Sequence, residues 1–98
     1  MVKYSLTKQA DHDISDLYAY TITAFGEGQA DKYYDGLINQ IELIAAHPEI
    51  YRQLDRFSPA VRICPYEAHI IIYRVEENGV IEIVRVRTAR SNWLSKYE

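Results

Sequence analysis

The sequence has 98 residues, of which 48% are hydrophobic and 26% charged, and its formal net charge is −3. This length predicts a single domain over residues 1–98, and no apolar run approaches the ~18 residues of a membrane span. The acidic balance excludes a polybasic nucleic-acid binder, so we expect no direct sequence-specific contact with nucleic acid.

The N-terminus and the cysteine content predict a cytoplasmic protein without cofactors. Polar residues occur too early for the apolar region of a secretory signal, and the lone Cys64 has no partner for an internal disulfide. The three histidines, His12, His47 and His69, fall on different predicted elements with no Cys or carboxylate at ligand spacing, so no metal is expected. No glycine-rich phosphate loop is present, so no nucleotide cofactor is implied.

The first half of the chain predicts two antiparallel helices after a short strand at 3–6. Thr7 is suited to cap the first helix, Gly26 can supply the left-handed position that ends it, and Pro48 stops the second. Apolar side chains recur at helical spacing over 8–25 and over about 28–46. The first stripe is Ala10, Ile14, Leu17, Tyr18, Thr21 and Phe25, and the second is Ala30, Tyr33, Leu37, Ile41 and Ile44.

The middle of the chain predicts an ordered loop and then a strand. Residues 48–60 contain two prolines and no periodicity, which is typical of a loop. We expect Ile50, Leu54 and Phe57 to anchor this loop by packing against the rest of the protein. Residues 61–64 predict a strand that carries Arg62, and residues 91–98 predict a polar tail or a short helix.

Residues 68–88 predict one β-hairpin with a two-residue turn at Asn78-Gly79. The flanking runs are rich in Ile, Val and Tyr, and Asn-Gly tolerates the two positive φ angles of a type I′ turn. Glu77 then faces Val80, and strand alternation assigns every side chain to one of two faces. The face expected to pack on the helices holds His69, Ile71, Tyr73, Val75, Glu82, Val84, Val86 and Thr88.

The second face of this hairpin is expected to be an open binding surface. It combines isoleucines with arginines: Ile70, Ile72, Ile81, Ile83, Arg74, Arg85 and Arg87. Arg62 is predicted on the same face, and Arg90 and Trp93 follow just beyond the last strand. An apolar patch bordered by guanidinium groups suits a protein partner that supplies an amphipathic helix and carboxylates, and these ten residues are the predicted contacts.

The order β-α-α-β-β-β predicts an α+β fold, a helical hairpin packed on one face of a small, largely antiparallel sheet. An ordered set of residues then matches a known pattern over nearly the whole chain. It comprises Leu6-Thr7, Ala10, Asp13, Ile14, Tyr20, Phe25-Gly26, Gln29-Ala30, Tyr33, Ile44-Ala45, Pro48, Val61-Arg62, Pro65-Tyr66, His69, Tyr73-Arg74-Val75 and Ile83-Val84-Arg85-Val86. With this set the chain resembles the ParE-type toxins of the RelE/ParE superfamily.

The resemblance implies a cytoplasmic toxin of a type II toxin–antitoxin system. It also implies a ParD-like antitoxin that neutralises the toxin in a hetero-oligomer, and DNA gyrase as the target. Such a toxin inhibits by binding and has no catalytic residues. The ten predicted contact residues would then bind the antitoxin or the target.

The RelE branch of the same superfamily gives the alternative, a ribosome-dependent mRNA endonuclease. Cleavage through the RNA 2′-hydroxyl requires a base, cations around the phosphate and an acid at the leaving group. Arg62 and Arg85 are the candidates for the phosphate, and Tyr97 for the base or acid. The lysines lie at positions 3, 8, 32 and 96, so the loop before Val61 and the strands that follow it have none, which favours the ParE branch.

Overall fold

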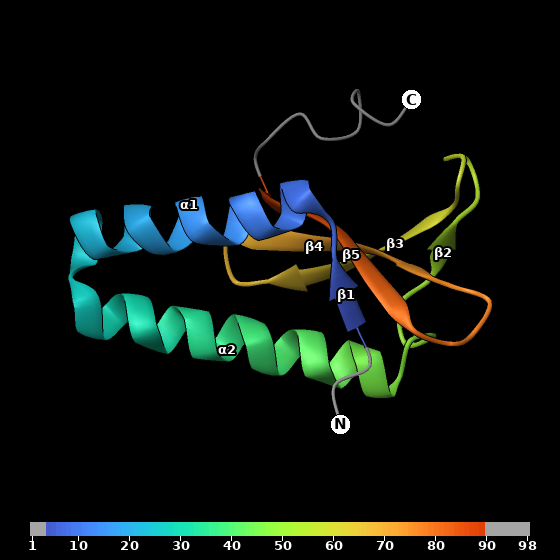
Figure 1. Ribbon diagram of the computed structural model, residues 1–98, viewed down its shortest axis with the longest axis horizontal. Coiled ribbons are helices and arrows are strands. Elements are labelled where there is room, and N and C mark those ends of the chain that lie inside the picture. Colours follow the sequence, from blue (N-terminus) through green and yellow to red (C-terminus); the bar gives the residue numbers. More distant parts are fainter. Residues whose placement is uncertain (1–3, 90–98) are drawn as a thin grey trace.

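The computed structural model describes residues 4–89, which form two helices packed on a five-stranded sheet (Figure 1). The elements are β1 (Tyr4–Leu6), α1 (Lys8–Phe25), α2 (Glu27–Ala46), β2 (Gln53–Leu54), β3 (Val61–Tyr66), β4 (His69–Val75) and β5 (Ile81–Thr88). The strand order is β1-β5-β4-β3-β2. Of these pairs β1 and β5 are parallel, and the others are antiparallel. The predicted α+β fold is confirmed, with β2 as an additional short strand inside the predicted loop.

Local sequence signals set the ends of both helices. The Thr7 hydroxyl accepts a hydrogen bond from the Ala10 N–H at 3.0 Å, so the predicted cap is confirmed. Gly26 has φ +94°, donates to the Ile22 carbonyl at 2.8 Å and accepts from the Ala30 N–H at 3.1 Å. Because this one residue both ends α1 and precedes α2, the helices must reverse sharply and lie antiparallel, as Figure 1 shows.

The main core fills the space between the helices and the sheet. Its buried members are Ala10, Ile14, Leu37, Ile41, Ile44, Cys64, Ile71, Tyr73, Ile81, Ile83 and Val86. The Tyr73 hydroxyl donates to the Pro48 carbonyl at 2.9 Å, and burial raises the pKa of this side chain to about 12. This bond fastens the segment after α2 to the sheet. Phe25, predicted in the core stripe, is instead 68% exposed, because the end of α1 extends past the sheet (Figure 1).

The turn of the β4–β5 hairpin differs from the predicted one. Its loop is Glu77–Gly79, closed by a 2.9 Å bond from the Glu76 N–H to the Val80 carbonyl. Within this loop only Gly79 has a positive φ, +83°, so the predicted type I′ turn is wrong. The Asn78 side chain accepts from the Val80 N–H at 3.0 Å, which stabilises the three-residue loop instead.

A β-bulge at Val84 then restores the predicted pairing. Tyr73 pairs with Ile83, whereas Ile72 pairs with Arg85, so Val84 has no residue opposite it. Between the turn and the bulge, each β5 side chain therefore lies on the face opposite to the predicted one. Beyond the bulge the predicted pairs, such as Ile71 with Val86, are confirmed.

The start of α1 holds the bulge in place. The Thr7 N–H donates to the Ile83 carbonyl at 3.1 Å, and the Thr7 hydroxyl donates to the Val84 carbonyl at 2.7 Å. The Val86 N–H donates to Asp13 Oδ2 at 3.0 Å. These bonds satisfy β5 backbone groups that β1 is too short to reach.

A smaller core lies on the other face of the sheet. Phe57, Val61, Ile70 and Ile72 form it, and Leu54, Ile63 and Val84 pack around them. The loop after β2 thus folds over this face, and the prediction that Leu54 and Phe57 pin it is confirmed. The predicted role of Ile50 is wrong, because its side chain is 57% exposed.

Candidate functional site

The four isoleucines predicted on an open surface are all buried. Ile81 and Ile83 are in the main core, because the three-residue turn reverses their faces. Ile70 and Ile72 keep the predicted face, but they are covered in the smaller core. The prediction that these four side chains form an open apolar patch is therefore wrong.

Arg62 lies on the helix side of the sheet, not with the other predicted arginines. It pairs with Tyr73 and stands two residues before Cys64, and both of those side chains are in the main core. Arg62 Nη1 donates to the Tyr51 carbonyl, while its buried Nε finds no acceptor in the part of the chain that the structure describes. The prediction that Arg62 shares the face of Arg74 is wrong.

Two other predicted arginines are neutralised within the chain. Arg85 binds Asp13 through two bonds, Nε to Oδ2 at 2.8 Å and Nη2 to Oδ1 at 2.9 Å. Arg74 forms an ion pair with Glu82. Arg90 and Trp93 lie outside the described residues. The predicted arginines therefore do not gather into one cluster among residues 4–89.

A long groove follows the flank of α1. It consists of two adjoining parts of about 560 and 520 Å³ that share Leu17, Tyr20, Ala68 and His69. One part is completed by Asp13, Asp16, Val86, Arg87 and Thr88, the other by Thr21, Phe25, Gln29 and Tyr33. We term these residues together the α1 groove. Of the predicted contact residues that the structure describes, Arg87 alone lines it.

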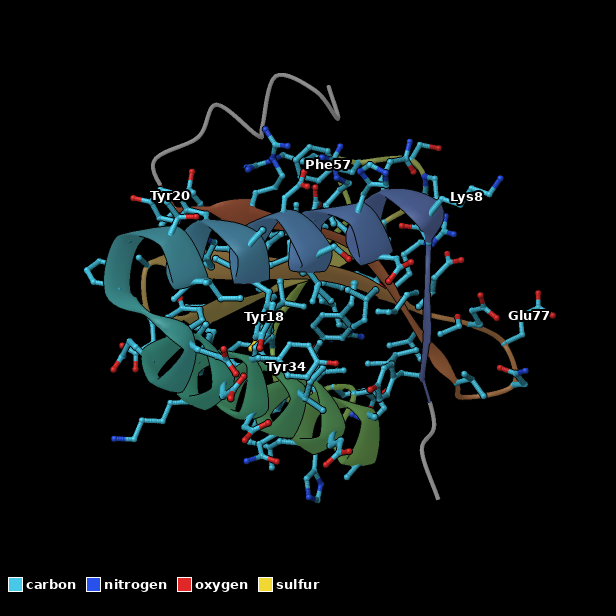
Figure 2. All side chains as sticks on the ribbon, turned by 60° about the vertical axis from the view of Figure 1, so that its left-hand side comes forward. Lys8, Tyr18, Tyr20, Tyr34, Phe57 and Glu77 are labelled. Atoms are coloured by element: carbon cyan, nitrogen blue, oxygen red, sulfur yellow. The ribbon has the colours of Figure 1, made fainter. Side chains whose placement is uncertain are left out.

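Two aromatic side chains of α1 are exposed to solvent along the α1 groove. Tyr20 is 65% and Phe25 is 68% exposed, and Figure 2 shows Tyr20 on the side of α1 that faces away from α2. Large aromatic side chains left in water in this way commonly mark an interaction surface. The sequence offered one signal for it, because Tyr20 is a large aromatic residue off the apolar stripe of its helix.

A tyrosine–histidine pair lies at the bottom of the α1 groove. The Tyr33 hydroxyl is 2.7 Å from His69 Nδ1, and the Tyr66 ring packs edge-on against Tyr33 at 5.2 Å. Burial raises the pKa of Tyr33 and lowers that of His69, so burial favours the neutral form of both groups, which share this one hydrogen bond. Gly36 makes room for Tyr66, because a Cβ at Gly36 would lie 2.0 Å from the Tyr66 hydroxyl.

This histidine is expected to make stability depend on pH. Because burial lowers the pKa of His69 below 6.5, the unfolded chain binds a proton more readily than the folded chain. The folded state keeps its full free energy of unfolding above pH 6.5, where the imidazole is neutral in both states. It loses stability as pH falls from 6.5 to the folded-state pKa of His69. The free energy of unfolding, measured in urea, should fall more between about pH 7.5 and about pH 5 in wild type than in His69→Asn. An equal loss of unfolding free energy in the two proteins would show that His69 is not the source of the pH dependence.

The helical hairpin is strongly acidic. From Lys8 to Ala46 it carries two lysines and seven carboxylates, a formal charge of −5. On its outer face the rings of Tyr18 and Tyr34 pack edge-on at 5.9 Å, between the two helices in Figure 2. The Tyr18 hydroxyl donates to Asp31 at 2.5 Å, a bond that raises the pKa of Tyr18.

The described residues contain neither a membrane-spanning helix nor a cluster of metal ligands. Neither α1 nor α2 is long and apolar enough to cross a membrane. Between Tyr4 and Ala89, no three His, Cys, Asp or Glu side chains gather closely enough to hold a metal ion.

The sequence is similar to known toxins over most of its length. The family model described as the ParE toxin of the type II toxin–antitoxin system parDE matches residues 4–93. Toxin ParE1 of Caulobacter vibrioides is 34% identical over 87 residues, 88% of each chain. Toxin ParE1 of Mycobacterium tuberculosis is 32% identical over 84 residues, 86% of each chain.

The fold is similar to that of a solved structure. A chain of the chromosomal ParDE toxin–antitoxin system from P. aeruginosa superimposes with a TM-score of 0.73, at 22% sequence identity. The match covers 90% of the present chain and 96% of the other. From the family match and the two sequence relatives together, the chain belongs to the ParE toxin family of type II toxin–antitoxin systems.

Proposed function

We propose that a ParD-like antitoxin binds and silences this toxin, and that the released toxin inhibits DNA gyrase in the cytoplasm. Inhibition proceeds by binding, without chemistry performed by the toxin. The observation that carries the proposal is the family match over residues 4–93, which spans every helix and strand described above. The name of the solved P. aeruginosa system, which pairs a ParE with a ParD, supports an antitoxin partner here.

The positions of the arginines favour a binding toxin over an mRNA endonuclease. The two arginines that a nuclease would use for the phosphate are Arg62 and Arg85, and β4 separates their strands. Arg62 is turned toward the Tyr51 carbonyl, and Arg85 is held by Asp13. A phosphate would have to compete with these internal partners, which argues against a preformed cationic site between them. Tyr97 lies outside the described residues.

A supercoiling assay tests the proposed target. Purified toxin is expected to suppress ATP-dependent supercoiling by gyrase by more than 80% once toxin is in excess. Antitoxin added first should restore supercoiling, and topoisomerase I should be unaffected as a control for DNA binding. The same toxin with ribosomes and mRNA should leave the message intact. Full supercoiling at high toxin excess would remove gyrase as the target, and codon-specific cuts in the mRNA would favour the nuclease branch.

A further inference from the structure

We infer that gyrase contacts this toxin through the outer face of the helical hairpin, where a cleft between α1 and α2 takes up an arginine side chain of the enzyme. The inference rests on the proposed function, because it takes gyrase as the target. It goes further by naming the surface of the toxin and the kind of gyrase side chain that meet there.

The cleft lies between α1 and α2 on the outer face of the hairpin, where Figure 2 shows Tyr18 and Tyr34. Its volume is about 350 Å³, and it is lined by Asp11, Ile14, Ser15, Tyr18, Asp31 and Tyr34. Tyr34 is 41% exposed, so its ring is open to a partner. None of these six residues lines the α1 groove, so the two surfaces are separate.

The two tyrosine rings favour a cation with a flat face. An arginine guanidinium is planar, so it can stack on a tyrosine ring while its N–H groups donate to a carboxylate beside the ring. Asp31 supplies such a carboxylate. Its Oδ1 accepts from the Tyr18 hydroxyl, and no donor to its Oδ2 is found among the described residues. A metal ion is a poorer occupant, because the described carboxylates of this face are not gathered closely enough to hold one.

Like charges repel along the α2 side of this face. Glu27, Asp31 and Asp35 follow one another at four-residue spacing, so their side chains lie on one side of the helix. The hydrogen bond to Asp31 raises the pKa of Tyr18, and the charges of Glu27 and Asp35 raise it further. No ion pair to any of these three carboxylates is found among residues 4–89. Like charges at this spacing destabilise a helix, and a cation from a partner would relieve their repulsion.

The charge of the hairpin identifies the kind of partner. From Lys8 to Ala46 the formal charge is −5, which repels nucleic acid, and a second copy of the chain would bring the same acidic face. An enzyme that binds DNA displays lysines and arginines that neutralise phosphates. Gyrase is such an enzyme, so it offers basic side chains that the acidic hairpin attracts before contact is made.

Binding of the whole toxin to immobilised gyrase, measured by surface plasmon resonance, tests this face. Tyr34→Lys replaces the exposed ring with a cation and should raise Kd about 30-fold, as for a central aromatic contact. Asp35→Lys should raise Kd about fivefold, mostly through slower association, and less at about 300 mM salt than at about 50 mM. The matched controls Tyr20→Lys and Glu77→Lys change exposed side chains outside the cleft and should stay within about twofold of wild type.

The outcomes separate this face from the proposed function. All variants must first show wild-type circular dichroism and melting, which is expected because the four side chains are exposed, and Asp35→Lys decides if Tyr34→Lys is unstable. If wild-type toxin neither binds nor inhibits gyrase, the proposed function fails, and this face has no such target. If wild type inhibits gyrase and both cleft variants bind it equally well, the proposed function stands and this face is not the contact. Loss of gyrase binding in Tyr20→Lys, with Tyr34→Lys unchanged, would place gyrase on the α1 groove and would also overturn the proposal.

Discussion

Replacing Asp13 with alanine is expected to lower the free energy of unfolding by about 3 kcal/mol, the lower end of the range for breaking a buried ion pair. The side chains of Arg85 and Asp13 are only 21% and 13% exposed. The substitution leaves the guanidinium without its bidentate partner and the Val86 N–H without its acceptor. Urea unfolding followed by circular dichroism measures the change.

Further variants isolate the cause of this loss of stability. Asp35→Ala, at an exposed position of α2, should change stability by less than about 0.5 kcal/mol. Asp13→Asn keeps an acceptor for Val86 but removes the charge, so its loss should fall between those of the two alanine variants. A double-mutant cycle with Arg85→Leu should give a coupling energy above about 1 kcal/mol. If Asp13→Ala and Asp35→Ala unfold at the same urea concentration, the ion pair does not contribute as described.

Replacing Ile83 with alanine is expected to cost about 3 to 4 kcal/mol, within the range for a fully buried Ile. Ile83 is completely inaccessible to solvent in the main core, whereas Val84 is only half-buried at the edge of the smaller one. Val84→Ala should therefore cost only about 1 kcal/mol. Melting temperature and urea midpoint give both values.

The comparison of these two positions tests the β-bulge. Ile83→Ala removes one methylene more than Val84→Ala, which accounts for only about 0.8 kcal/mol of the expected difference. The remainder comes from the faces that the two side chains occupy. In a hairpin without the bulge and with a two-residue turn, Val84 would be the core residue, so a larger loss for Val84→Ala than for Ile83→Ala would rule out the observed register.

The helices could be predicted from sequence because their signals are local. Thr7 as a cap, Gly26 as a reversal and the apolar stripe of each helix all act within a few residues. The position of the hairpin turn could also be predicted, because Asn78-Gly79 is a local signal. Its type could not be predicted in the same way, because Asn78-Gly79 fits both a two-residue and a three-residue loop. The two loops put Ile81 and Ile83 on opposite faces of the sheet, so the choice depends on where the main core lies.

The candidate site was harder to predict because it depends on contacts between distant segments. The bulge that turns Ile81 and Ile83 into the core is held by Thr7 and Asp13, more than 70 residues earlier in the chain. Those contacts also neutralise Arg85, which in the sequence looks available to a partner. Periodicity describes each segment by itself, so it could not show that Phe57 would cover Ile72 or that α1 and the β3–β4 turn would enclose a groove.

The parallel pairing of β1 with β5 has a consequence for synthesis on the ribosome. Thr7 and its acceptor, Val84, are 77 residues apart. At about 5 to 20 residues per second, translation of that interval takes about 4 to 15 s. During this time the nascent chain has no strand on which its first strand can dock. A message cut before codon 81 encodes a product that lacks β5 altogether, so native toxin is made only from a transcript that is nearly intact.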